Sequence, residues 1–248
     1  MDGVKSFYDK QHQWANVYAC DVAAYHRDKA ESIGLPEREA PYRILELGCG
    51  GVQMTAALAD LGHSLVAIDL NPAAIRNAHR LAAARPHAQI TLIEGDFYAL
   101  ALQGNFDVVC YFDGFGIGSD ADQRQLLHRI ASWLTEGGRA FIEIYTPWYW
   151  ARMDGVGMEW PDASRRYGFD EASCRMLDTW WPPDRPEEAV TQSLRCYSPE
   201  GFSSLLNGTG LGLMDIRPGG AIDSQTGEFQ SEVPLEAAMQ YAAILTQL

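Results

Sequence analysis

The chain has 248 residues, a net charge of −14 and 47% hydrophobic residues. This is ordinary composition for a globular protein large enough to fold without disulfide or metal support. An acidic surface repels phosphate polymers and anionic lipid, so we expect neither nucleic acid nor membrane as a partner. No apolar run reaches the roughly 18 residues of a membrane span. The N-terminal residues also lack the regions of a signal peptide, and a cytoplasmic location is expected.

The cysteines argue against two further classes of protein. There are five of them, an odd number, and none forms a C-x-x-C pair. This usage is atypical of zinc sites and of secreted disulfide frameworks. We therefore expect no metal and mostly buried thiols.

The first 38 residues are predicted to be helical. Trp14, Tyr18, Val22 and Tyr25 recur at spacings of four, four and three, which places them on one face of a helix. A proline-bounded linker follows at 35–41.

From residue 42, short apolar runs alternate with helical segments. Strands are predicted at 43–47, 64–68, 89–93, 106–112 and 139–145, with helices at 52–61, 71–84 and 120–134. Asn71-Pro72 and Ser198-Pro199 are typical helix starts. Two late strands are predicted near 214–217 and 239–245. Alternation of this kind predicts an α/β fold whose parallel sheet has helices on both faces.

Residues 147–197 interrupt this alternation. They contain five of the seven tryptophans and no lysine, which is too apolar for a disordered linker. We interpret them as an inserted substrate cap. The predicted organisation is a helical lid at 1–38, a sheet domain at 39–146 and 198–248, and the cap at 147–197.

The segment Gly48-Cys49-Gly50-Gly51 lies between a predicted strand and a helix. Glycines there let the backbone approach a ligand closely, and the helix N-terminus favours negative charge. Asp69 ends the next strand, where a carboxylate can bind both hydroxyls of a ribose, or can simply cap the following helix. Because Gln53 occupies the sixth position of G-x-G-x-x-G, a nicotinamide cofactor is disfavoured.

Further motifs follow in order and at fixed spacing. They are Leu45-Glu46-Leu47-Gly48-Cys49-Gly50, Glu94-Gly95-Asp96-Phe97, Phe112-Asp113-Gly114 and the pair Gly137-Gly138. Over about residues 40–146 this series resembles the class I S-adenosylmethionine (SAM)-dependent methyltransferases of small-molecule type. The resemblance implies a Rossmann-like seven-stranded sheet, mostly parallel with the last strand antiparallel. It also implies SAM as cofactor and S-adenosylhomocysteine (SAH) as product.

The resemblance further implies roles for individual residues. Gly48 and Gly50, with Cys49 between them, would lie under the methionine and ribose, and Glu46 would orient this loop. Asp69 would hold the ribose hydroxyls. The remaining implied cofactor contacts are Leu70, Asp96 and Phe97 around the adenine, Asp113 in the passage to the substrate, and Tyr8, Trp14 and Tyr18 from the lid.

Candidates for the chemistry and for the acceptor are less constrained. Transfer proceeds by in-line displacement, in which positioning supplies most of the catalysis and a general base is optional. His26 is the first candidate base, with Tyr145 and Asp113 as further catalytic candidates, and Glu143 is either functional or a buried partner of an arginine. The aromatic residues of the insert suit a flat or cationic acceptor or simply pack as core. The candidate substrate contacts are Tyr25, Tyr145, Trp148, Trp150, Trp160 and Trp181, and Trp180 belongs to the same aromatic group.

We therefore expect methyl transfer to an oxygen or nitrogen of a small organic acceptor, in secondary metabolism. The segment Phe112-Asp113-Gly114-Phe115 is not the Asn/Asp-Pro-Pro-Tyr/Phe loop of amino-methylating nucleic-acid enzymes. The alternatives are a nicotinamide-dependent oxidoreductase, a non-catalytic SAM-binding sensor or assembly protein, and other chemistry on a retained sulfonium. The sequence leaves monomer and homo-oligomer equally open.

Overall fold

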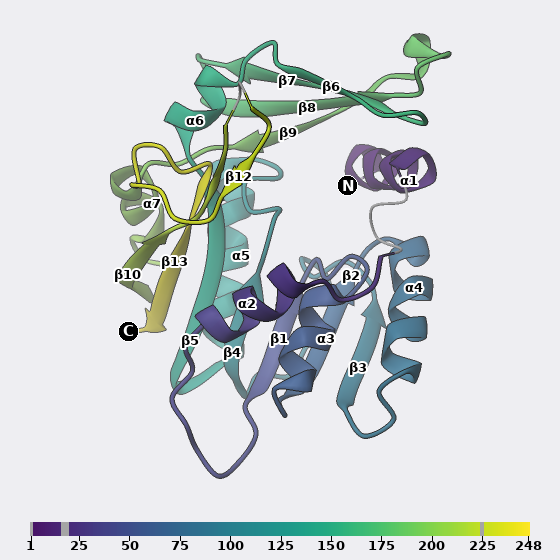
Figure 1. Ribbon diagram of the computed structural model, residues 1–248. Helices are drawn as coiled ribbons and strands as arrows, with labels where there is room; N and C mark the ends of the chain where they lie inside the picture. Colours follow the sequence, from purple (N-terminus) through teal and green to yellow (C-terminus); the bar gives the residue numbers. More distant parts are fainter. Residues whose placement is uncertain (1, 16–19, 224–225) are drawn as a thin grey trace.

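A seven-stranded sheet forms the centre of the computed structural model, which describes residues 2–15, 20–223 and 226–248 (Figure 1). The strand order is β10-β13-β5-β4-β1-β2-β3, and β13 runs antiparallel to both of its neighbours. The predicted Rossmann-like sheet is therefore confirmed. Its strands are β1 (Arg43–Leu47), β2 (Ser64–Asp69), β3 (Gln89–Glu94), β4 (Phe106–Tyr111), β5 (Leu134–Tyr145), β10 (Leu211–Pro218) and β13 (Gln240–Gln247).

Helices cover both faces of this sheet, because successive strand residues point to opposite sides. Leu45 and Leu47 pack in one hydrophobic cluster with α5 (Asp120–Trp133) and α7 (Pro199–Leu206). Ile44 packs in another, with α2 (Ala24–Ser32) and α3 (Gln53–Asp60). On that same side Ala67 of β2 contacts α4 (Pro72–Ala83).

Two predicted helix starts are confirmed. The Asn71 side chain accepts hydrogen bonds from the backbone N–H groups of Ala73 and Ala74, ahead of a proline at the first helical position. The Ser198 side chain likewise accepts from Gly201. Such local signals depend on a few neighbouring residues, which is why sequence alone identifies them.

The insert after β5 folds as a short helix followed by a second sheet. Helix α6 (Pro147–Arg152) precedes an antiparallel sheet in the order β6-β7-β8-β9, which lies above the main sheet in Figure 1. Its strands are β6 (Gly157–Glu159), β7 (Ser164–Asp170), β8 (Arg175–Trp181) and β9 (Val190–Arg195), with the 3-10 helix η1 (Pro186–Glu188) before β9. Two further short strands, β11 (Ala221–Ile222) and β12 (Phe229–Gln230), pair with each other.

The N-terminal region corrects the prediction of one continuous helical face. Helix α1 (Asp2–Ala15) and α2 are separate, and residues 20–23 between them are not helical. Trp14 on α1 is buried against Ala163 and Trp180, whereas Tyr25 on α2 is 62% exposed. The spacing rule fails here because it assumes an unbroken helix, while the N–H of Ala23 bonds the His26 ring and starts a new one. Tyr18 lies outside the described residues.

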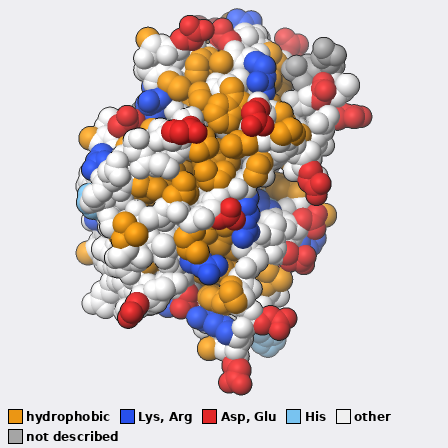
Figure 2. All heavy atoms as spheres, turned by 90° about the vertical axis from the view of Figure 1, so that its left-hand side faces the viewer, with side chains coloured by type: hydrophobic (Ala, Val, Ile, Leu, Met, Phe, Trp, Pro, Cys, Tyr) orange, Lys and Arg blue, Asp and Glu red, His pale blue; other side chains and the backbone are white. Residues whose placement is uncertain are grey.

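Strand β10 is one edge of the main sheet, on the face shown in Figure 2, where hydrophobic side chains are mixed with acidic and basic ones. Met214 is half exposed, but Asp215 and Arg217 form an ion pair beside it, and Pro218 ends the strand. A register irregularity falls between Leu213 and Asp215. Charges, a proline and a bulge are features that discourage pairing of an edge strand with other chains. No helix in the described part of the chain has the length and apolarity to cross a membrane.

Candidate active site

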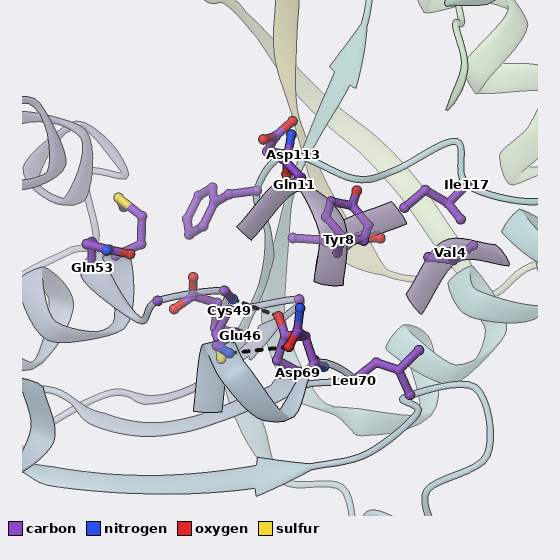
Figure 3. A pocket seen from close by; sticks show the side chains of 18 of the residues that line it. Val4, Tyr8, Gln11, Glu46, Cys49, Gln53, Asp69, Leu70, Asp113 and Ile117 are labelled. Atoms are coloured by element: carbon purple, nitrogen blue, oxygen red, sulfur yellow. Dashed lines mark hydrogen bonds between the residues drawn. The ribbon is translucent and has the colours of Figure 1, made fainter. Parts of the chain in front are cut away.

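A cavity of about 570 Å³ opens where the carboxyl ends of β1, β2 and β4 meet α1, α2 and the second sheet. This edge is where ligands of open α/β sheets gather, and the volume suits a small-molecule site. In Figure 3, Glu46 and Asp69 lie on one side of the cavity and Asp113 on another, with Tyr8 and Gln11 of α1 between them.

The glycine loop forms part of the cavity wall. Gly48 and Gly50 have φ of 61° and 51°, a left-handed conformation that glycine adopts without steric cost. A Cβ on Gly48 would also lie only 3.3 Å from the Tyr111 ring. Cys49 between them is buried, and its N–H bonds the Ile68 carbonyl. The loop is therefore held against the end of β2 with its backbone open to a ligand.

Asp69 lines the cavity and is tied to the backbone through both oxygens. Its Oδ2 accepts from the Gly50 N–H and its Oδ1 from the Asn71 N–H, each at 2.7 Å. Burial raises the pKa of Asp69, while these backbone N–H groups oppose the shift. Since Asn71 caps α4, the alternative that Asp69 caps that helix is wrong. Its remaining lone pairs are available to a ligand in the cavity.

Glu46 is buried beneath the glycine loop and also lines the cavity. The Thr55 hydroxyl donates to its Oε2. Burial raises the pKa of Glu46 to about 7, and the Thr55 hydrogen bond and the nearby Lys29 moderate the shift. The carboxyl group therefore titrates in the physiological range, beside the part of the cavity next to the glycine loop.

This titration predicts a pH dependence of stability. The folded protein holds the Glu46 proton up to about pH 7, whereas the unfolded chain releases it near 4.5. Because the unfolded state binds fewer protons between these values, the free energy of unfolding decreases as pH rises through this window. At about 1.36 kcal/mol per pH unit, the contribution lost is about 3 kcal/mol.

Glu46→Gln lacks this titration, so its free energy of unfolding relative to wild type is expected to rise by about that amount as pH increases through the window. Urea unfolding of both proteins between pH 5 and pH 8 measures the difference, and parallel stability curves would contradict it.

The predicted adenine contacts also line the cavity. These are Leu70, Asp96 and Phe97. The Asp96 Oδ1 accepts from the Tyr98 N–H at 2.8 Å, which fixes the carboxylate at the start of the loop after β3. The Phe97 ring packs edge-on against Tyr111. An acid and an aromatic ring are thus presented together after β3.

Asp113 lines the cavity and follows β4 with a left-handed φ of 50°. The hydroxyl of Tyr145, at the end of β5, donates to its Oδ1. Burial and the neighbouring Asp113 raise the pKa of Tyr145 far above its usual range, so the phenol keeps its proton. Tyr145 is not among the lining residues, and its contact with the cavity runs through Asp113.

His26 lines the cavity, but its bonding does not suit a general base. Its Nδ1 accepts from the Ala23 N–H at 3.0 Å, so the neutral ring carries its proton on Nε2. Burial, with smaller effects from Lys29 and Arg27, lowers the pKa of His26. The ring lies 3.8 Å from that of Tyr25, which also lines the cavity. In this tautomer the neutral His26 ring has an N–H donor on Nε2 and no free nitrogen lone pair, so it does not serve as the general base.

Several predicted aromatic contacts lie elsewhere. The indole of Trp148 donates to the Leu235 carbonyl and that of Trp150 to the Met239 carbonyl, and neither side chain is among the lining residues. Trp14 packs between α1 and the second sheet in a hydrophobic cluster and is likewise absent from the lining. The cavity lining contains Trp180 and not the predicted Trp181, because adjacent residues of a strand face opposite sides. Trp160 is in the lining as predicted.

Two features of the site were not predicted. Lys29 pairs with Glu143 at 2.6 Å and lies over the Phe112 ring, so the predicted buried acid has a lysine partner instead of an arginine. Arg165 of β7 lines the cavity as well. Its position depends on the register of the second sheet, and no sequence motif marks it.

Comparisons with known proteins identify the class that this fold and site define. Residues 44–138 match the family described as "Methyltransferase domain". The chain is 32% identical over 114 residues to the cypemycin N-terminal methyltransferase of a Streptomyces species, a match that spans 45% of each protein.

Solved structures agree over nearly the whole length. A SAM-dependent methyltransferase from Clostridium acetobutylicum ATCC 824 has a TM-score of 0.71 at 15% identity and covers 98% of both chains. The glycopeptide N-methyltransferase MtfA has a TM-score of 0.61 at 18% identity, covering 92% of this chain and 93% of its own. MtfA has also been solved with SAM and with SAH.

Residues 44–138 therefore carry a methyltransferase domain, and the fold of the chain is shared with solved SAM-dependent methyltransferases. These findings support SAM as its cofactor and favour it over a nicotinamide. The cavity fits this group: a glycine loop, a buried acid beneath it, an acid at the end of β2 and an acid with an aromatic ring after β3 all line one cavity.

Proposed function

We propose that this chain transfers the methyl group of SAM to a small organic acceptor, and that the acceptor atom is an amine nitrogen. The observation that carries the choice is Asp113, whose carboxylate lines the cavity and is held by the Tyr145 hydroxyl. A carboxylate attracts an ammonium group and accepts hydrogen bonds from an amine, whereas a neutral hydroxyl lacks the attraction between opposite charges. The printed names of the cypemycin N-terminal methyltransferase and of MtfA support nitrogen as the acceptor.

In this proposal the chain's own residues mainly bind and orient. When bound, SAM supplies an electrophilic methyl group on a sulfonium. Asp69 would hold the ribose, Asp96 and Phe97 the adenine, and Glu46 would lie near the cationic methionine amine. Asp113 would align the acceptor nitrogen, whose lone pair forms the new N–C bond as the S–C bond breaks and its electron pair stays on sulfur. An acceptor that arrives as an ammonium first loses a proton to solvent, which exposes the lone pair, and the methylated nitrogen then loses its extra proton to Asp113 or to solvent.

Two measurements test this function. Calorimetric titration is expected to show binding of SAM and SAH and none of NADH. Incubation with SAM and the matched probes 2-phenylethylamine and 2-phenylethanol, read by mass spectrometry, is expected to show a single methyl gain on the amine. Methylation of the alcohol alone would overturn nitrogen as the acceptor. Binding of SAM without turnover on any amine of a wider panel would favour the non-catalytic alternative.

A further inference from the structure

Arg165 on β7 and Trp180 on β8 are direct cross-strand partners in the second sheet, and both line the cavity. Neither belongs to the motifs of the methyltransferase domain, which end before residue 139. The Arg165 guanidinium lies 4.9 Å from the Trp180 ring centroid and 4.3 Å from that of Tyr167. The Trp180 ring is stacked on that of Trp160, with ring planes 5° apart.

Asp178 holds the Arg165 guanidinium in one orientation. Its two oxygens accept from Nε at 2.6 Å and from Nη2 at 2.8 Å, and Asp178 is itself buried. The third nitrogen, Nη1, has no hydrogen-bond partner among the described residues, and it is not one of their fully buried polar atoms. The guanidinium of this cavity-lining residue is therefore held in advance, and one of its nitrogens is left without a partner by the described residues.

Trp180 adds a second observation. The side chain is 4% exposed, and its indole Nε1 is buried without a partner among the described residues. A buried donor without an acceptor is costly, and native sites commonly resolve such groups with a ligand or a water. Arg165 Nη1 and Trp180 Nε1 are thus two donors, on directly paired residues, that the described residues leave without an acceptor.

The charge around this place selects the kind of oxygen. Asp178 already offsets the Arg165 charge through two hydrogen bonds. Asp113 lies in the same region, since both Asp113 and Arg165 act on the pKa of the buried Tyr145. A carboxylate on the ligand would be repelled by these negative charges, whereas an uncharged carbonyl accepts the same hydrogen bonds without that repulsion.

We propose that Arg165 and Trp180 form a subsite for an uncharged carbonyl oxygen of the acceptor, beside the Trp160–Trp180 stack. The acceptor class is then an amine that also carries an amide or ester carbonyl. The amine is bound at Asp113 and the carbonyl at Arg165. This inference rests on the proposed amine methylation and adds the second group by which the acceptor is recognised.

The test compares L-phenylalaninamide with 2-phenylethylamine, which has the same ring and amine but no carbonyl. Calorimetry on the SAH-saturated protein is expected to show at least about tenfold tighter binding of the amide, as one hydrogen bond to a charged donor provides. L-Phenylalanine, with a carboxylate, is expected to bind more weakly than the amide. Equal affinities for the amide and 2-phenylethylamine, or no binding of either, would overturn the subsite.

Variants of the two residues test whether the preference for the amide arises at this subsite. Arg165→Met and Arg165→Lys are both expected to remove the preference for the amide, the second while keeping a cation against Asp178. Trp180→Phe is expected to reduce it. The matched controls are Arg166→Met and Trp181→Phe, adjacent residues outside the cavity lining, which should leave the preference unchanged. Persistence of the preference in both Arg165 variants would contradict the assignment.

The two proposals fail separately. Methyl gain on both amines at equal rate and affinity leaves the proposed function standing and removes the subsite. Preferential binding of the amide without methyl gain on either amine retains the subsite and removes the methyl transfer to nitrogen. SAM affinity, measured in every variant, should stay within a fewfold of wild type because Arg165 and Trp180 lie outside the residues assigned to the cofactor.

Discussion

Asp69→Ala is expected to lower the affinity for SAM and for SAH by about two to three orders of magnitude. In the proposed site the carboxylate accepts from two ribose hydroxyls, and each hydrogen bond to a charged group contributes about 1.5–3 kcal/mol. The substitution also releases the Gly50 and Asn71 N–H groups, which Asp69 holds at 2.7 Å, so the glycine loop loses part of its order. Calorimetric titration with SAM and SAH measures the effect.

The control for Asp69→Ala must separate lost binding from lost folding. Circular dichroism and thermal unfolding should show a folded variant, and Asp69→Asn, which keeps the side-chain shape, should also bind weakly. Asp21→Ala is the matched control, because Asp21 is an exposed acid that pairs with Arg80 at the surface. Unchanged affinity of folded Asp69→Ala for SAM and SAH would contradict the assignment of Asp69 to the ribose.

The sheet and the cofactor side of the cavity were predictable because their signals are local. A short, mostly apolar strand such as β1, the glycines that follow it and the helix start at Asn71-Pro72 each constrain the few residues around them. Parallel strands then bring their carboxyl ends to one edge, so Glu46, Asp69, Asp96 and Asp113 meet without any further information.

The acceptor side was less predictable because it depends on register and on contacts between distant segments. A shift of one residue exchanges Trp180 for Trp181 on the inner face of β8, and composition cannot distinguish them. His26 is conspicuous in the sequence, but its Nδ1 is taken by the start of its own helix. Arg165 becomes a site residue only when β7 and β8 pair and Asp178 orients it. The same dependence explains why Trp148 and Trp150, bonded to the backbone of the C-terminal segment, form core instead of a substrate box.

Asp113→Asn is expected to lower the methylation rate by about 100-fold while SAM affinity changes little. Asparagine preserves the shape and tolerates the left-handed φ of 50° that alanine would adopt only at a cost. It removes the negative charge that aligns the acceptor amine and receives its proton, and general-base contributions are typically 10²–10⁴-fold. Single-turnover kinetics with an amine acceptor from the probe panel measure the chemical step directly.

Tyr145→Phe distinguishes a catalytic Asp113 from a structural one. The Tyr145 hydroxyl donates to Asp113, so its loss frees the carboxylate without removing its charge. A smaller loss of rate, about tenfold, is therefore expected in Tyr145→Phe, and the double variant should be no slower than Asp113→Asn, because the two residues act as one unit. Asp184→Asn, an exposed acid in the loop after β8, is the matched control and should retain full activity. Equal rates in wild type and Asp113→Asn would contradict the assignment of the acceptor amine to Asp113.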